Sequence, residues 1–116
     1  MINDIRLSPH FKLREFQCRC CGTVKLFPEL LDMLELMRSV WGIPMIVTSG
    51  YRCPQRNAAV GGASKSLHMY GAAADISASV RNQALLREIA DFAGFTEVIC
   101  GGESNYIHVG CKELVK

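Results

Sequence analysis

The chain has 116 residues, 49% of them hydrophobic and 21% charged, and its formal net charge is +2. This length and composition are typical of one soluble globular domain with a single core. So small a charge argues against a protein that binds nucleic acid or an anionic membrane surface, and no apolar run reaches the roughly 18 residues that a membrane span needs.

Residues 1–22 are expected to form an N-terminal arm of irregular or short-stranded structure, because their hydrophobicity shows little periodicity. The N-terminal sequence is mixed in charge and has no apolar segment of a signal peptide, so we expect the protein to be cytoplasmic as synthesised. His10 of this arm is interpreted as a structural or solvated histidine. Four apolar side chains of the arm could lie over a core: Leu7, Phe11, Leu13 and Phe16.

The six cysteines are a high number for a cytoplasmic domain. Three cluster in the arm, at Cys18, Cys20 and Cys21, and three are dispersed, at Cys53, Cys100 and Cys111. One interpretation is a set of reduced thiols, some of them buried. A second is a structural zinc at Cys18, Cys20 and Cys21, although C-x-C-C departs from the usual C-x₂-C knuckle. A disulfide between the cluster and Cys53 is the third, and the sequence does not choose among them.

Two amphipathic helices are predicted from apolar residues spaced three and four apart. The first covers 28–41, starting at a proline and ending before Gly42, which are favourable start and stop signals. Its apolar stripe is Leu30, Leu31, Leu34, Met37 and Val40. The second follows Ser79, a candidate cap, and ends at about Ala93 before Gly94. Its predicted apolar face is Ala84, Leu85, Ile89, Phe92 and Ala93.

Short strands are predicted at 45–48, 72–76, 96–100 and 106–109, and a helical turn is expected near 54–60. The turn sequence GGESN between the last two strands indicates a hairpin. This order of elements predicts an α+β domain, in which two helices pack against a small, mainly antiparallel sheet.

The long loop region within 49–76 contains the first two of three potential metal ligands, His68 and Asp75; His108 lies in the last strand. Alternation along that strand places Tyr106 and His108 on the same face, so the three side chains can converge if the strands of Asp75 and His108 are neighbours. Two imidazoles and a carboxylate are typical of a catalytic zinc site with an open fourth position. From spacing alone, ordinary hydrogen-bonded histidines remain the alternative.

The segment 66–75, SLHMYGAAAD, resembles the Ser-x-His-x-x-Gly-x-Ala-x-Asp signature of the D-Ala-D-Ala carboxypeptidase family of zinc peptidases. This family includes vancomycin-resistance dipeptidases and phage L-alanyl-D-glutamate endopeptidases. SGYR at 49–52, Asn57, Gly61-Gly62 and YIHVG at 106–110 are also similar, and the arm resembles the small phage-type branch. The resemblance implies that 1–116 is a single zinc peptidase domain with the α+β fold shared by the Hedgehog signalling domain.

The resemblance also implies roles for individual residues. His68, Asp75 and His108 are expected to bind one Zn²⁺, which would activate water for peptide hydrolysis. Arg52 is expected to steady the substrate carbonyl and the oxyanion, because its guanidinium is permanently charged and fork-shaped. Ser66 is expected to hydrogen-bond near the metal or the substrate.

One position departs from the family pattern. Several members place a Glu or Asp three residues before the last histidine ligand, as the base that takes a proton from water, and here that residue is Asn105. An amide cannot accept the proton but can orient water or substrate. Glu103 is the nearest carboxylate and is a candidate base, with an exposed turn residue as the alternative. Tyr106 is a further polar candidate for binding substrate.

The first functional hypothesis is a zinc peptidase that cuts peptidoglycan stem peptides at a bond involving a D-amino acid. It would be a monomer of phage or prophage type, acting on the cell wall after release. The second hypothesis, motivated by Asn105, is a catalytically impaired zinc-containing module that binds the cell wall or belongs to a phage particle. A peptidase for another class of peptide is the third.

Overall fold

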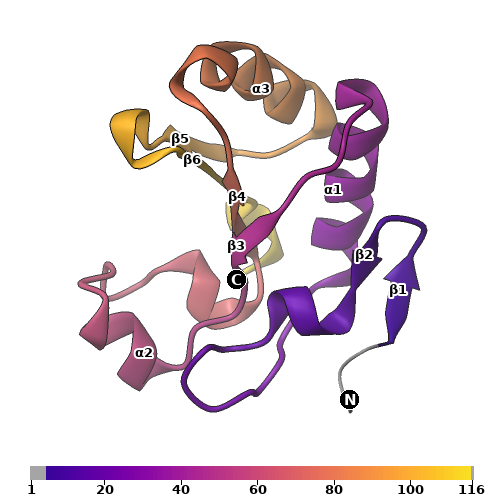
Figure 1. The fold of residues 1–116 in the computed structure, drawn as a ribbon. Coiled ribbons are helices and arrows are strands. Elements are labelled where there is room, and N and C mark those ends of the chain that lie inside the picture. Colours follow the sequence, from indigo (N-terminus) through magenta and orange to yellow (C-terminus); the bar gives the residue numbers. More distant parts are fainter. Residues whose placement is uncertain (1–4, 116) are drawn as a thin grey trace.

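The four-stranded sheet at the centre of the protein has the order β3-β4-β6-β5, and every neighbouring pair is antiparallel. The computed structural model describes residues 5–115 (Figure 1). The strands are β3 (Val47–Ser49), β4 (Ala73–Ser77), β5 (Glu97–Cys100) and β6 (Tyr106–Gly110). This confirms the predicted α+β class with a small antiparallel sheet. The predicted strand at 45–48 starts later, at Val47, and the one at 72–76 is shifted by one residue.

Three helices accompany the sheet: α1 (Pro28–Trp41), α2 (Pro54–Ala59) and α3 (Val80–Ala93). The two long helices have the predicted limits, since Pro28 opens α1 and Gly42 and Gly94 follow the ends of α1 and α3. Ser79 occupies the cap position of α3, but its side chain makes no capping hydrogen bond. Within residues 5–115, no helix combines the length and apolarity that crossing a membrane requires.

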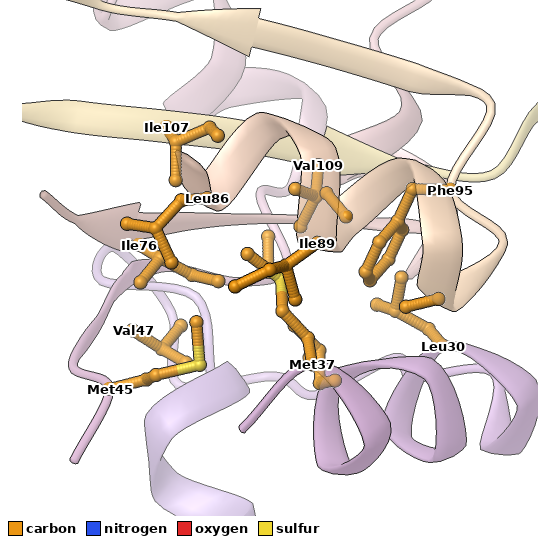
Figure 2. Close-up of a cluster of buried hydrophobic side chains, with 14 of the residues drawn as sticks. Leu30, Met37, Met45, Val47, Ile76, Leu86, Ile89, Phe95, Ile107 and Val109 are labelled. Carbon is orange, nitrogen blue, oxygen red and sulfur yellow. The ribbon is translucent and has the colours of Figure 1, made fainter. Parts of the chain in front are cut away.

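The main core lies between one face of the sheet and the helices α1 and α3. Figure 2 shows the side chains of Ile76, Ile107 and Val109 from the strands facing Met37 of α1 and Ile89 of α3. Ile107 and Val109 are fully buried, as the predicted alternation along β6 requires. The opposite face of the sheet is therefore left for polar side chains.

The apolar face predicted for the second helix is partly wrong. Leu85 and Phe92 are 52% and 70% exposed, and the buried face follows another helical row. That row is Leu86, Ile89, Ala90 and Ala93, which repeats at intervals of three and four residues. In α1, Val40 is likewise exposed, whereas the rest of the predicted stripe is buried or half-buried.

The N-terminal arm begins with a two-stranded antiparallel sheet of β1 (Arg6–Ser8) and β2 (Phe11–Lys12), followed by a 3₁₀ turn, η1 (Leu13–Phe16). Phe11 and Phe16 are buried in the main core, and Leu7 is 37% exposed. His10 contacts α1, where its Nδ1 and backbone N lie 2.7 Å from the carboxylate oxygens of Glu35. The arm is thus packed onto the domain; residues 1–4 of the predicted arm, and residue 116, lie outside the described residues.

Candidate metal centre

The three predicted ligands come from three elements that meet on the polar face of the sheet. Asp75 of β4 and His108 of β6 are directly opposite each other in the antiparallel register. His68 lies in a 3₁₀ turn, η2 (Leu67–Tyr70), which starts at Ser66 and ends at Gly71. Gly71 has a φ of +74°, and a Cβ there would lie 2.5 Å from the Lys25 carbonyl oxygen, so only glycine fits this turn without strain.

The ligand atoms of the three side chains converge on one point. Asp75 Oδ1 lies 3.1 Å from His68 Nε2 and 2.9 Å from His108 Nδ1, and the two ring nitrogens are 3.2 Å apart. Ligands at ~2.0–2.1 Å from a tetrahedral zinc are about 3.3 Å from one another. The observed triangle is close to that size.

The outer ring nitrogens show how both histidines present lone pairs to this point. His68 Nδ1 is 2.8 Å from the carbonyl oxygen of Gly50, and His108 Nε2 is 2.6 Å from Glu97 Oε1. A carbonyl and an ionised carboxylate only accept hydrogen bonds, so each outer nitrogen carries the proton. The inner nitrogens of the neutral rings are then acceptors facing the Asp75 carboxylate. Three converging acceptors can share one cation, and this donor set fits Zn²⁺.

Electrostatics at the centre favour a negative charge on Asp75 and a positive charge beside it. Burial acts to raise the pKa of Asp75, but hydrogen bonds with His108 and His68, and their charges, hold that pKa well below its usual range. For His108, burial acts to lower the pKa, and the hydrogen bonds with Asp75 and Glu97 outweigh it, so the pKa of His108 is raised. The Asp75 carboxylate between the two rings therefore favours a bound cation or proton.

Arg52 reaches the same centre from the loop after β3. Its guanidinium donates hydrogen bonds of 3.3 Å to Ser49 Oγ, Asn57 Oδ1 and Asp75 Oδ2. Its backbone N–H donates to the carbonyl oxygen of His68 at 3.1 Å. Three anchors fix the plane of the guanidinium beside a predicted metal ligand, as a positioned cation for substrate requires.

A cavity of about 350 Å³ opens at the centre. Of the predicted site residues, those that line it are Arg52, Ser66, His68, Asp75, Tyr106 and His108. Lys65, Glu97 and Ile99 also contribute to its wall. Glu103 and Asn105 are exposed and do not line the described cavity. Glu103 belongs to the turn η3 (Gly102–Ser104), and Asn105 follows it with a φ of +58°.

Glu97 is a site residue that the sequence interpretation missed. Ile99 of β5 is opposite His108, and alternation puts Glu97, two residues earlier, on the same face. Its second carboxylate oxygen is 3.9 Å from Lys112 Nζ. The sequence signal for Glu97 was the predicted hairpin, because placing its turn fixes the register of β5 and β6.

The cysteines of the arm approach Cys53 in the structure. The sulfur atoms of Cys18, Cys21 and Cys53 all lie within 4.8 Å of one another, and all six cysteines are free thiols. Burial acts to raise the pKa of Cys18, but backbone N–H groups of Cys53, Cys21 and Cys20 lower it to about 6. The group of three differs from the predicted set Cys18, Cys20 and Cys21 by the inclusion of Cys53, since Cys20 is not part of the mutual cluster.

Comparison with known proteins gives two matches. The family model described as Peptidase M15 matches residues 9–110. The zinc D-Ala-D-Ala carboxypeptidase of Streptomyces albus G is 40% identical over 80 residues, which is 66% of this chain. The matched segment spans 31% of that relative's own length. The family match covers the predicted ligands, Arg52 and most of the arm.

Proposed function

The chain belongs to the peptidase M15 family, and from this membership and its metal centre we propose that it is a zinc-dependent peptidase. Its proposed substrates are peptidoglycan stem peptides, cut at a bond that involves a D-amino acid. The similar Streptomyces albus G protein is described as a zinc D-Ala-D-Ala carboxypeptidase, which supports this class of substrate.

The observation that carries the proposal is the arrangement of His68, Asp75 and His108 at the wall of an open cavity. A structural zinc site is closed by four protein ligands, whereas a catalytic site has three and leaves a position for water or substrate. Here three ligands face a space of about 350 Å³, which can accommodate part of a peptide.

When zinc is bound at this centre, it supplies a Lewis acid that polarises a carbonyl and lowers the pKa of a bound water to ~7. Arg52 is placed to hold the carbonyl oxygen of the scissile bond and the negative charge that develops on it. Lys65 lines the same cavity and can pair with a carboxylate of the stem peptide. Ser66 and Tyr106 offer hydroxyl groups for orienting the peptide.

A general base must accept the proton of the attacking water, and two carboxylates are candidates. Glu97 lines the cavity, but its Oε1 is engaged with His108 Nε2 at 2.6 Å. Glu103 lies in the exposed turn η3 before β6 and would reach the cavity only if this turn closes on the substrate. We propose Glu103 as the base and Glu97 as the residue that orients His108.

The test is cleavage of purified peptidoglycan and of synthetic stem peptides, followed by mass spectrometry. Zinc-loaded wild type is compared with His68→Ala, Glu103→Gln and Glu97→Gln, and Glu88→Gln on an exposed face of α3 is the matched control. We expect cleavage by wild type and control and none by His68→Ala. Loss of turnover in Glu103→Gln, with zinc still bound, identifies the base. Loss in Glu97→Gln alone transfers that role to Glu97.

A second candidate function is a zinc-containing module that binds the cell wall or belongs to a phage particle and has little activity. It is favoured by the exposed positions of Glu103 and Asn105, which leave the described cavity without an uncommitted carboxylate. If the zinc-loaded wild type binds peptidoglycan in a pull-down assay but releases no peptide, this function replaces the peptidase.

We also propose that the protein acts as a monomer of phage or prophage origin and reaches the cell wall after release. The resemblance of the arm and signature to the small phage-type branch supports this proposal. Sedimentation of the purified protein tests the monomer. Lysis of cells by added protein, compared with lysis of cells that express the protein, tests where it acts.

A further inference from the structure

A second cluster of metal-ligating side chains lies away from the cavity, where the arm meets the loop after β3. The sulfur atoms of Cys18, Cys21 and Cys53 lie within 4.8 Å of one another. Thiolates at ~2.3 Å from a tetrahedral zinc are about 3.8 Å apart, so this spacing needs little adjustment to enclose one ion. None of the three lines the cavity of the first site.

The local backbone is folded as a ligand-bearing turn. The carbonyl oxygen of Cys18 accepts a hydrogen bond of 2.9 Å from Gly22 N, and Cys18 N donates to Thr23 O at 2.8 Å. The turn so closed contains Cys18 and Cys21, which have the C-x₂-C spacing of zinc knuckles. That spacing is concealed in the sequence by Cys20, which makes the motif read as C-x-C-C.

Backbone N–H groups point at the sulfur atoms. Cys53 N donates to Cys18 Sγ, and Arg56 N donates to Cys53 Sγ, both at 3.4 Å. The N–H groups of Cys20 and Cys21 also contact the Cys18 sulfur. Successive N–H groups directed at one atom form a concavity that stabilises negative charge, as thiolate ligands require.

We propose that Cys18, Cys21 and Cys53 bind a second, structural zinc ion, with Cys20 as the fourth ligand. The Cys20 thiol is exposed and belongs to the same closed turn as Cys18 and Cys21. All-sulfur, four-coordinate zinc sites are typical of structural positions. Each thiol releases its proton to solvent when the ion binds.

The position of the thiol cluster links it to the His68–Asp75–His108 centre. The segment 50–53 ends at Cys53 and contains Gly50, whose carbonyl oxygen holds His68 Nδ1, and Arg52. The arm already contacts this segment, because Tyr51 N donates to Phe16 O at 2.9 Å. A zinc ion shared by Cys18, Cys21 and Cys53 would bind the arm to the segment that orients a ligand and a substrate-binding arginine of the catalytic centre.

The experiment counts zinc in protein purified under reducing conditions and without a metal-affinity step. We expect two zinc ions per chain for wild type, one for His68→Ala and one for Cys53→Ser. Cys100→Ser, in β5 away from the cluster, is the matched control and should keep two. If the first site binds no zinc, His68→Ala and wild type have the same zinc content, and Cys53→Ser still reports on the second site. The two sites are therefore tested separately.

Cobalt replacement provides a measurement that does not depend on how well Cys53→Ser folds. Cobalt bound by thiolates gives an intense sulfur-to-metal charge-transfer absorption, which imidazole and carboxylate ligands do not give. We expect this absorption in wild type and in His68→Ala, weakened in Cys20→Ser. Its absence from wild type, a single zinc that His68→Ala removes, or a disulfide within the cluster of the active protein would overturn the proposal. Unchanged cobalt affinity in Cys20→Ser would overturn the fourth ligand.

Discussion

The His68–Asp75–His108 centre and the Cys18–Cys21–Cys53 cluster are both triangles of ligand atoms, but their supports differ. Two ligands of the first lie on paired strands, and both of its histidines are fixed through their outer nitrogens by Gly50 and Glu97. The second is built from an arm and a loop and is supported by backbone N–H groups. Rigid strands beside a cavity suit catalysis, whereas loops joined by thiolates suit a structural clamp.

Removing the shared carboxylate should produce the largest difference between the two clusters. In Asp75→Asn, the atom that contacts both inner ring nitrogens is no longer charged. Because Lewis-acid stabilisation is worth several kcal/mol, we expect kcat/KM to fall by about three orders of magnitude or more. Metal analysis should show the loss of one zinc ion and retention of cobalt–thiolate absorption.

Asp91→Asn, on the exposed surface of α3, is the control for Asp75→Asn and should match wild type in both measurements. Loss of thiolate absorption together with the first zinc would mean that the two clusters fold as one unit, and the contrast between them would fail.

Arg52→Lys tests whether the segment shared by the two clusters has a catalytic role. Lysine keeps the charge but cannot reproduce the three hydrogen bonds that fix the guanidinium. Loss of one oxyanion donor costs about 10²–10³ in kcat, so we expect an effect of that size. Both zinc ions should remain bound. A variant with normal kcat and a raised KM would place Arg52 in ground-state binding only.

Glu97→Gln probes the support of the first centre. A glutamine keeps the shape of the side chain but no longer holds the His108 ring as a charged acceptor. Loss of such an outer partner typically costs 10–100-fold in metal affinity. We expect zinc affinity at the first centre to fall by about that factor, measured by competition with a chelator, and kcat at saturating zinc to stay near wild type. The thiol cluster should be unaffected.

The contrast between the two clusters also explains how much the sequence could predict. The ligands of the first centre follow from a compact signature and from alternation along one strand, and the structure brings His68, Asp75 and His108 together as expected. Helix α1 was predictable because its stripe, its proline and Gly42 agree with one another.

What escaped prediction depends on the folding of segments distant in the sequence. Glu97 could be assigned only after the register of β5 and β6 was known. Cys53 joins Cys18 and Cys21 because the arm crosses beside the loop after β3, and no local pattern indicates that crossing. In α3, Leu85 and Phe92 suit an apolar face as well as Leu86 does, and only packing against α1 and the sheet decides between the rows.

The smallest expected effect concerns the contacts that attach the arm to α1 without involving its thiols. Glu35 of α1 accepts hydrogen bonds from Ser8 Oγ, His10 N and the His10 ring. Burial acts to raise the pKa of Glu35, but these hydrogen bonds and the charge of His10 outweigh it, so the pKa is lowered. The ionised carboxylate therefore stabilises the folded protein above its unfolded pKa, and this contribution disappears as the pH falls through the lowered folded value.

Glu35→Gln should consequently lower the free energy of unfolding by about 1–2 kcal/mol at pH 7. A hydrogen bond to a charged group is worth about 1.5–3 kcal/mol and one to a neutral group about 0.5–1.5, and glutamine keeps a neutral acceptor. Urea unfolding of zinc-free wild type and variant at pH 7 and near pH 3 measures the difference, with Glu88→Gln as the control. The difference should shrink at the lower pH, where the wild-type carboxylate is increasingly protonated. A difference that stays constant would assign the effect to packing and not to the charge of Glu35.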